Sequence, residues 1–147
     1  MKKVLTILFA IMTVTSIPAA VYAVDVEHVW PDRGDRKPPF STAVRVDNML
    51  YLSGALGFVD GKLAEGGTGP ETVAALESIK RNLESNGSSL SQAVKCTVFL
   101  ADIADFGEMN AEYVKYFPEN PPARSTVAVS GLALNANVEI ECMAWVD

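Results

Sequence analysis

The residues best suited to chemistry are an arginine and a glutamate in the last quarter of the chain. Arg124 follows the stiff segment Pro121-Pro122-Ala123 and opens a strand-type run. A guanidinium held there is well placed to bind a carboxylate through two parallel hydrogen bonds. Glu139 projects from the side of the final run that also carries Met and Trp, where a carboxylate is costly unless paired or used. The structural alternatives stay open: a salt bridge for Arg124 and a paired surface acid for Glu139.

Three other residues are weaker candidates. Asn110 lies at the edge of an apolar helical stripe, where it could bind a ligand or simply make a packing hydrogen bond. Ser53 and Gly54 end a strand-type run, which leaves backbone groups open to a ligand, although a plain turn explains the pair equally well. None of these positions identifies a reaction alone.

The cysteines and the histidine do not indicate a metal centre. Cys96 and Cys142 both sit inside apolar strand-type runs, and we interpret them as two small buried core side chains. A disulfide between them is the alternative, whereas a catalytic thiol would lack a histidine to activate it. His28 has no ligand partners near it in the sequence. We therefore expect no metal and no cofactor.

The charge balance argues against a nucleic-acid partner. The 147 residues carry 12 Lys and Arg against 18 Asp and Glu, a formal net charge of −6. Binding to phosphates depends on clustered basic side chains, which this chain lacks.

The N-terminal segment has the pattern of a secretory signal. Lys2 and Lys3 precede the uncharged apolar run 4–17, and Val21 and Ala23 occupy the −3 and −1 positions of a small-residue cleavage site. We expect cleavage after Ala23, with an uncleaved anchor as the alternative. Its removal takes away two lysines and no acid, so the mature charge becomes −8. The expected location is secreted or periplasmic, without a membrane association after cleavage.

The remaining chain predicts an extended arm over 24–39 and one domain over 40–147. Period-two alternation predicts strands at 43–46, 49–52, 93–100, 125–129 and 138–146. Helical spacing predicts a first helix that begins at a capping box of Thr68 and Glu71 and ends at Asn86-Gly87. A second helix begins at Asp105 as its cap and is stopped by Pro118.

The order of these elements is ββ-α-β-α-ββ, which predicts an α+β fold with two helices on one face of a mostly antiparallel sheet. In the final strand Val138, Ile140, Cys142 and Ala144 point one way, and the alternate residues point the other. The second face includes Met143 and Trp145. An exposed face of this kind indicates burial against another subunit.

Four segments resemble the Rid family, also called the YjgF-type family, of reactive-intermediate deaminases. They are YLSGALG at 51–57, VKCTVFLADIADFGEMNAEYVKYF at 94–117, PPARSTV at 121–127 and VEIECMAWV at 138–146. The resemblance implies a chorismate-mutase-like fold and a homotrimer with ligand clefts between subunits. It also implies hydrolysis of 2-imino or enamine acids to 2-oxo acids and ammonia, of the 2-iminobutanoate/2-iminopropanoate deaminase kind, without a cofactor.

The resemblance also assigns roles to particular residues. Arg124 matches the arginine that grips the substrate carboxylate, and Glu139 matches the glutamate that orients the attacking water. The positions that match the substrate-binding cleft are Phe40, Ser53, Gly54, Asn110 and Thr126.

Two departures concern this cleft. Phe40 stands where many members have a tyrosine, and Thr126 where many have a cysteine. Both are expected to alter rate or substrate preference. A competing function from another class is a non-catalytic trimeric module that binds small carboxylates or acts as a chaperone-like surface.

Overall fold

The computed structural model describes residues 23–31 and 38–147. The expected secretory segment therefore lies outside the described residues, apart from Ala23. Within the described part of the chain, no helix is long and apolar enough to cross a membrane.

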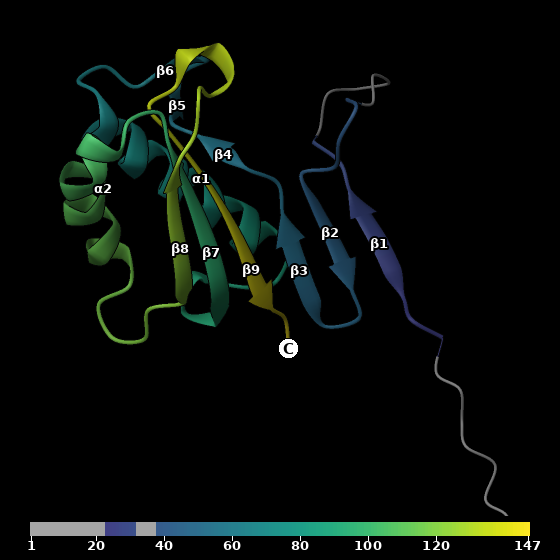
Figure 1. Cartoon of the computed structure of the whole chain (residues 1–147). Helices are drawn as coiled ribbons and strands as arrows, with labels where there is room; N and C mark the ends of the chain where they lie inside the picture. Colours follow the sequence, from purple (N-terminus) through teal and green to yellow (C-terminus); the bar gives the residue numbers. More distant parts are fainter. Residues whose placement is uncertain (1–22, 32–37) are drawn as a thin grey trace, which may run out of the picture.

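A mixed sheet forms one layer, and two helices cover one of its faces (Figure 1). The strands hydrogen-bond in the order β1-β2-β3-β9-β7-β8, and β4 also pairs with β9. Their bounds are β1 Val26–Val29, β2 Ala43–Val46, β3 Met49–Leu52, β4 Ala55–Leu56, β7 Ala93–Leu100, β8 Ala123–Ala128 and β9 Val138–Trp145. Among the described strands, β7 and β8 are parallel neighbours and the other pairings in this sheet are antiparallel. The predicted α+β class is confirmed.

Two tight turns join pairs of short strands, and each contains a residue with a positive φ. Asp47 adopts a positive φ of 50° between β2 and β3, as the tight hairpin requires. Asp60 and Gly61 also have positive φ angles, in the turn between β5 (Phe58–Val59) and β6 (Lys62–Leu63).

The core lies between the sheet and helices α1 (Thr68–Ser85) and α2 (Phe106–Tyr113). Leu76, Ile79 and Leu83 of α1 are fully buried, at the helical spacing seen in the sequence. A short 3₁₀ turn, Val114–Tyr116, continues α2 before Pro118 ends it. Alternate residues of β9 are buried on this side, from Val138 to Ala144.

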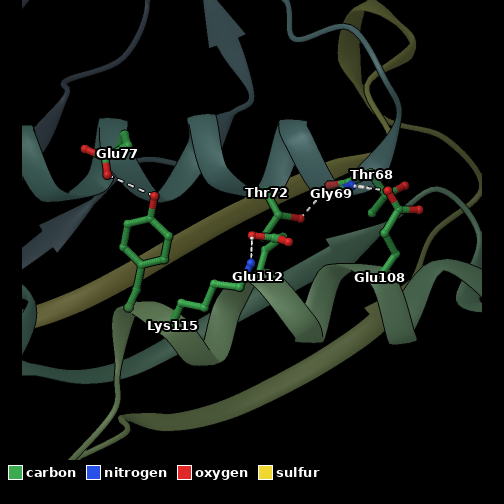
Figure 2. A network of polar contacts seen from close by, with 8 residues as sticks. Thr68, Gly69, Thr72, Glu77, Glu108, Glu112 and Lys115 are labelled. Carbon is green, nitrogen blue, oxygen red and sulfur yellow. Dashed lines mark hydrogen bonds and ion pairs between the residues drawn. The ribbon is translucent and has the colours of Figure 1, made fainter.

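Asp105 is the N-cap residue of α2 as predicted, although its side chain makes no capping hydrogen bond there, whereas the predicted capping box of α1 was wrong. Gly67 is the N-cap of α1, and no side chain closes a capping box. Thr68 instead donates to Asp105 at 2.7 Å, and Glu108 accepts from the backbone N–H of Gly69 at 2.7 Å. Figure 2 shows Glu108 of α2 directed at the first turn of α1. Glu108 of α2 therefore caps the neighbouring helix, because tertiary packing brings its carboxylate to an orphan N–H group in the first turn of α1.

Part of the predicted extended arm, Val26–Val29, forms β1, which pairs antiparallel with β2. Val29 packs against the core. The strand adds an edge to the sheet and brings His28 opposite Val44.

The interpretation of the cysteines as two free core thiols was wrong. Cys96 of β7 and Cys142 of β9 stand directly opposite each other and form a disulfide, with their Cα atoms 4.1 Å apart. Both residues are buried. The two thiols are therefore consumed in the core, and neither is available as a nucleophile or a metal ligand.

Candidate functional site

The helix-facing side of the edge strand β8 carries Arg124. In register it stands beside Cys96, a buried residue that faces the helices. Its guanidinium donates to Asn110 of α2 at 2.8 Å and lies 4.5 Å from the centroid of the Tyr113 ring. Phe106 contributes a second ring at 5.7 Å. A cation held over aromatic faces keeps its orientation while it remains half-exposed.

These contacts leave Arg124 able to bind a ligand. It forms no ion pair within the described part of the chain, so the salt-bridge alternative does not hold there. A guanidinium has five N–H donors, and the hydrogen bond to Asn110 uses one of them. The free donors can bind a carboxylate in the forked geometry that arginine favours.

Thr126 lies two residues further along β8, on the same side as Arg124 because strand side chains alternate. Its hydroxyl is buried without a hydrogen-bond partner in the protein. The outer edge of β8 has no neighbouring strand among the described residues, so part of its backbone remains unpaired. Arg124, Asn110 and Thr126 thus form one group, which we call the arginine half.

Burial also affects Tyr113, which forms the floor under Arg124. Desolvation raises the pKa of the Tyr113 phenol to about 12, although the positive charge of Arg124 acts in the opposite direction. The phenol is therefore neutral near pH 7, and its aromatic face packs against the guanidinium of Arg124.

A second group, the glutamate half, forms around Glu139. Its carboxylate packs directly against Gly54, so that a Cβ at this position would displace the Glu139 side chain. Ser53, the next residue, donates its hydroxyl to the backbone oxygen of Ser41 at 2.7 Å. Phe40 is 62% exposed and lines two neighbouring cavities, one with Ser53 and one with Gly54. The glutamate half therefore comprises Phe40, Ser53, Gly54 and Glu139.

The two halves do not meet within one chain. Arg124 stands beside Cys96, which faces Cys142, and Cys142 lies three residues from Glu139 along β9. Strand rise and strand spacing put the Cα atoms of Arg124 and Glu139 about 14 Å apart. Their side chains also leave opposite faces of the sheet, since Glu139 alternates with the buried Val138 and Ile140. A three- or four-carbon acid cannot reach both.

No group of three or more metal-binding side chains occurs in 23–31 and 38–147. Sequence reasoning also missed two features near the halves. The ring-bearing side chains of His28 and Trp30 line the larger cavity beside Phe40. Glu71 is buried and accepts two hydrogen bonds from Asn137, just before β9. The sequence pattern assigns Glu71 to a local capping box, and therefore does not reveal its pairing with Asn137.

The profile of the family described as Endoribonuclease L-PSP matches residues 34–146. The chain belongs to this family. The family match begins after β1 and takes in both halves of the candidate site.

Curated relatives of this L-PSP family chain include named deaminases. It is 43% identical over 108 residues to Reactive Intermediate Deaminase A, chloroplastic, of Arabidopsis thaliana, which covers 72% of this chain and 58% of the plant protein. It is 40% identical over 108 residues to human 2-iminobutanoate/2-iminopropanoate deaminase, with 72% and 79% of the two chains covered.

Solved structures of similar proteins share the fold. A Rid family protein from Yersinia pestis superposes with a TM-score of 0.76 at 32% identity, over 83% of this chain and all of the other. RidA from an Antarctic Psychrobacter gives a TM-score of 0.71 at 35% identity, over 81% and 94%. These relatives establish a Rid-type fold for this L-PSP family chain, and membership in a family that includes imine and enamine deaminases.

Proposed function

We propose that this protein hydrolyses 2-imino or enamine acids to 2-oxo acids and ammonia. The observation that carries the proposal is Arg124, a half-exposed guanidinium that is oriented by Asn110 and Tyr113 and has donors to spare. A small substrate with one carboxylate fits such a group. The deaminase names of the plant and human relatives support the same class of reaction.

In the proposed reaction Arg124 holds the substrate carboxylate, and Glu139 orients a water molecule towards C2. The water oxygen forms a bond to C2 while the C=N double bond becomes a single bond and the nitrogen takes a proton. The resulting carbinolamine then loses ammonia as its hydroxyl becomes the new carbonyl. Imine hydrolysis is intrinsically easy, so positioning and charge complementarity suffice as the protein's contribution.

We further propose that the site is completed by a second copy of the chain in a homotrimer. The separation of Arg124 and Glu139 supports this arrangement, because each subunit then supplies one half of a cleft to a neighbour. The outer sheet face supports it as well. Tyr51 and Trp145, 40% and 39% exposed in a single chain, lie there next to Met143. Apolar faces of this kind are commonly covered in oligomers.

The fate of 2-iminopropanoate tests the function directly. The imine is generated from alanine with an amino-acid oxidase and catalase, and semicarbazide traps what remains. The wild-type protein should divert the imine to pyruvate, whereas Arg124→Ala should lose about 100-fold or more in kcat/KM, since a charged hydrogen-bond pair is lost. Lys115→Ala removes an exposed cation of the same charge and should behave as wild type.

If the wild-type protein accelerates loss of the imine no more than Arg124→Ala does, the proposed deaminase function fails. Calorimetric titration with pyruvate would then show whether the protein is instead a carboxylate-binding module, since binding without turnover is its expected signature. The family description names an endoribonuclease. The net charge of −6 weighs against RNA as a substrate.

We also propose that the protein acts in an exported compartment, after cleavage behind Ala23. Two independent features support this location: the signal-like pattern of residues 1–23 and a buried disulfide, which is typical of oxidising compartments. The N-terminal sequence of the protein recovered outside the cytoplasm of its host should begin at Val24. A chain that begins at Met1 and remains in the membrane fraction would indicate the uncleaved anchor.

A further inference from the structure

A cavity of about 730 Å³ opens beside the glutamate half, with the N-terminal strand as one of its walls. Its lining includes four ring-bearing side chains and two serines, namely His28, Trp30, Phe40, Ser41, Tyr51 and Ser53. The rings of His28 and Trp30 are stacked, with centroids 6.2 Å apart and planes 25° from parallel. Three of the rings, Trp30, Phe40 and Tyr51, are at least 39% exposed in a single chain, and Tyr51 belongs to the outer sheet face proposed above to lie against a neighbouring subunit, so the cavity borders that contact.

Hydrogen bonds connect this cavity to the candidate site. His28 Nδ1 lies 3.1 Å from the hydroxyl of Ser41, and the backbone oxygen of Ser41 accepts from the Ser53 hydroxyl. Ser53 directly precedes Gly54, which packs against Glu139. The side chain of His28 is therefore fixed by residues that continue into the glutamate half.

The position of the two N-terminal rings is set by backbone pairing. His28 stands opposite Val44 in the ladder of β1 and β2, and Tyr51 stands opposite Val44 in the ladder of β2 and β3. Directly paired residues project from the same side of a sheet, so His28 and Tyr51 share a face. The family profile begins at residue 34, after His28 and Trp30. Membership in the family consequently does not account for these rings.

We propose that this cavity receives the side chain of the substrate and selects 2-imino acids with an aromatic side chain. The inference rests on the proposed deaminase function and specifies its substrate class. A methyl or ethyl substituent would leave most of such a cavity unfilled. An aromatic ring can stack on His28 and Trp30 and contact Phe40, in the offset and edge-on arrangements that aromatic groups prefer.

The experiment compares two imines on the full-length protein. Amino-acid oxidase generates the imine from either phenylalanine or alanine, and semicarbazide traps the excess in both cases. The expected result for wild type is a higher kcat/KM with the phenylalanine-derived imine. Trp30→Ala and His28→Ala should each lower that value about tenfold, with a change of less than about twofold for the alanine-derived imine.

Two further variants serve as controls. Trp30→Phe keeps a ring in the cavity and should retain most of the preference. Val26→Ala alters an exposed side chain of the same strand outside the cavity and should leave both imines unaffected. Light scattering of each variant reports the oligomeric state. A fall in mass for Trp30→Ala would show that the rings are a subunit contact, which would overturn the proposal.

A binding measurement separates failure of the subsite from failure of the function. Calorimetry with phenylpyruvate and pyruvate reports the preference without any turnover. Wild type should bind phenylpyruvate at least about tenfold more tightly, and Trp30→Ala should abolish the difference. Absence of turnover with both imines would refute the deaminase function. The titration would still show whether the cavity prefers an acid with an aromatic side chain. Equal affinity for the two acids, or equal losses with both imines, would refute the subsite.

Discussion

The carboxylate of Glu71 accepts two hydrogen bonds from Asn137, one from its backbone N–H at 2.8 Å and one from its side-chain amide at 2.6 Å. Glu71 is 2% exposed and lies in the first turn of α1, whereas Asn137 ends the loop that leads into β9. The pair therefore ties the helix to the strand that carries Glu139, two residues after Asn137.

We predict that Glu71→Gln lowers both stability and turnover. A glutamine offers one acceptor oxygen where the carboxylate offers two, so one donor of Asn137 loses its partner. The free energy of unfolding should fall by about 1–3 kcal/mol, the usual cost of an unpaired buried polar group. Because the start of β9 would shift, kcat should fall several-fold with KM little changed.

Urea unfolding and the imine assay measure these two effects. Glu84→Gln, an exposed carboxylate on the same helix, is the matched control and should change neither. Full activity in a destabilised Glu71→Gln protein would contradict a positioning role for Glu71 and leave it with a structural role alone.

The opposite placement of Arg124 and Glu139 predicts complementation between inactive chains. Arg124→Ala and Glu139→Gln should each be nearly inactive as pure proteins. When the two are unfolded together in equal amounts and refolded, a cleft is intact only if one neighbour supplies Arg124 and the other supplies Glu139. Random assembly gives this combination in about one quarter of the clefts of a cyclic oligomer.

Recovery of about a quarter of wild-type activity would thus indicate sites shared between subunits. A mixture as inactive as its parents would place both residues in one chain's own site, against the arrangement proposed above. Refolded wild type, treated in the same way, corrects for the yield of refolding.

The disulfide between Cys96 and Cys142 should contribute substantially to stability. It links residues 46 positions apart, and the entropy of closing a loop of this length corresponds to about 4 kcal/mol in the chain-entropy treatment. We expect the urea midpoint of the wild-type protein to fall when unfolding is carried out with a reductant. The double variant Cys96→Ala and Cys142→Ala should be less stable and indifferent to the reductant. A wild-type midpoint unaffected by reductant would show that the bridge is not formed in solution.

Tyr113 should make the fold sensitive to high pH. Burial raises the pKa of its phenol to about 12 in the folded protein, against an ordinary value of 10.0. The unfolded chain therefore releases a proton in this range that the folded chain retains. The stabilising contribution is complete below pH 10 and is lost as the pH rises towards 12.

Replacement with phenylalanine tests this contribution. The Tyr113 hydroxyl has no hydrogen-bond partner within the described chain, so Tyr113→Phe should cost less than about 1 kcal/mol at pH 7. The variant should lose stability less steeply than wild type between pH 10 and 12 in urea titrations. Tyr116 remains in both proteins, where burial and the hydrogen bond to Glu77 also raise its pKa to about 12. Identical slopes would contradict the role assigned to Tyr113.

Local sequence patterns predicted strands β2, β3, β7, β8 and β9 and the extent of the first helix, but not the short strands β1 and β4. Alternation along 138–146 identified which residues of β9 face the core, because side chains of a strand alternate irrespective of its neighbours. An Asp47-Asn48 pair between two apolar runs likewise predicts a turn, and Asp47 there has a positive φ. The motifs around Arg124 and Glu139 were also sufficient to indicate the family, which the profile match confirms.

Tertiary structure decided every relationship that depends on register or on contact between distant segments. The sequence could not place Cys96 opposite Cys142, because spacing along a chain says nothing about which residues of two strands are paired. It assigned Glu71 and Asp105 to local caps, whereas packing gave them partners 66 and 37 residues away. It also named Arg124 and Glu139 as members of one site. Only the register of the sheet shows that, within one chain, the side chains of Arg124 and Glu139 project from opposite faces and do not meet.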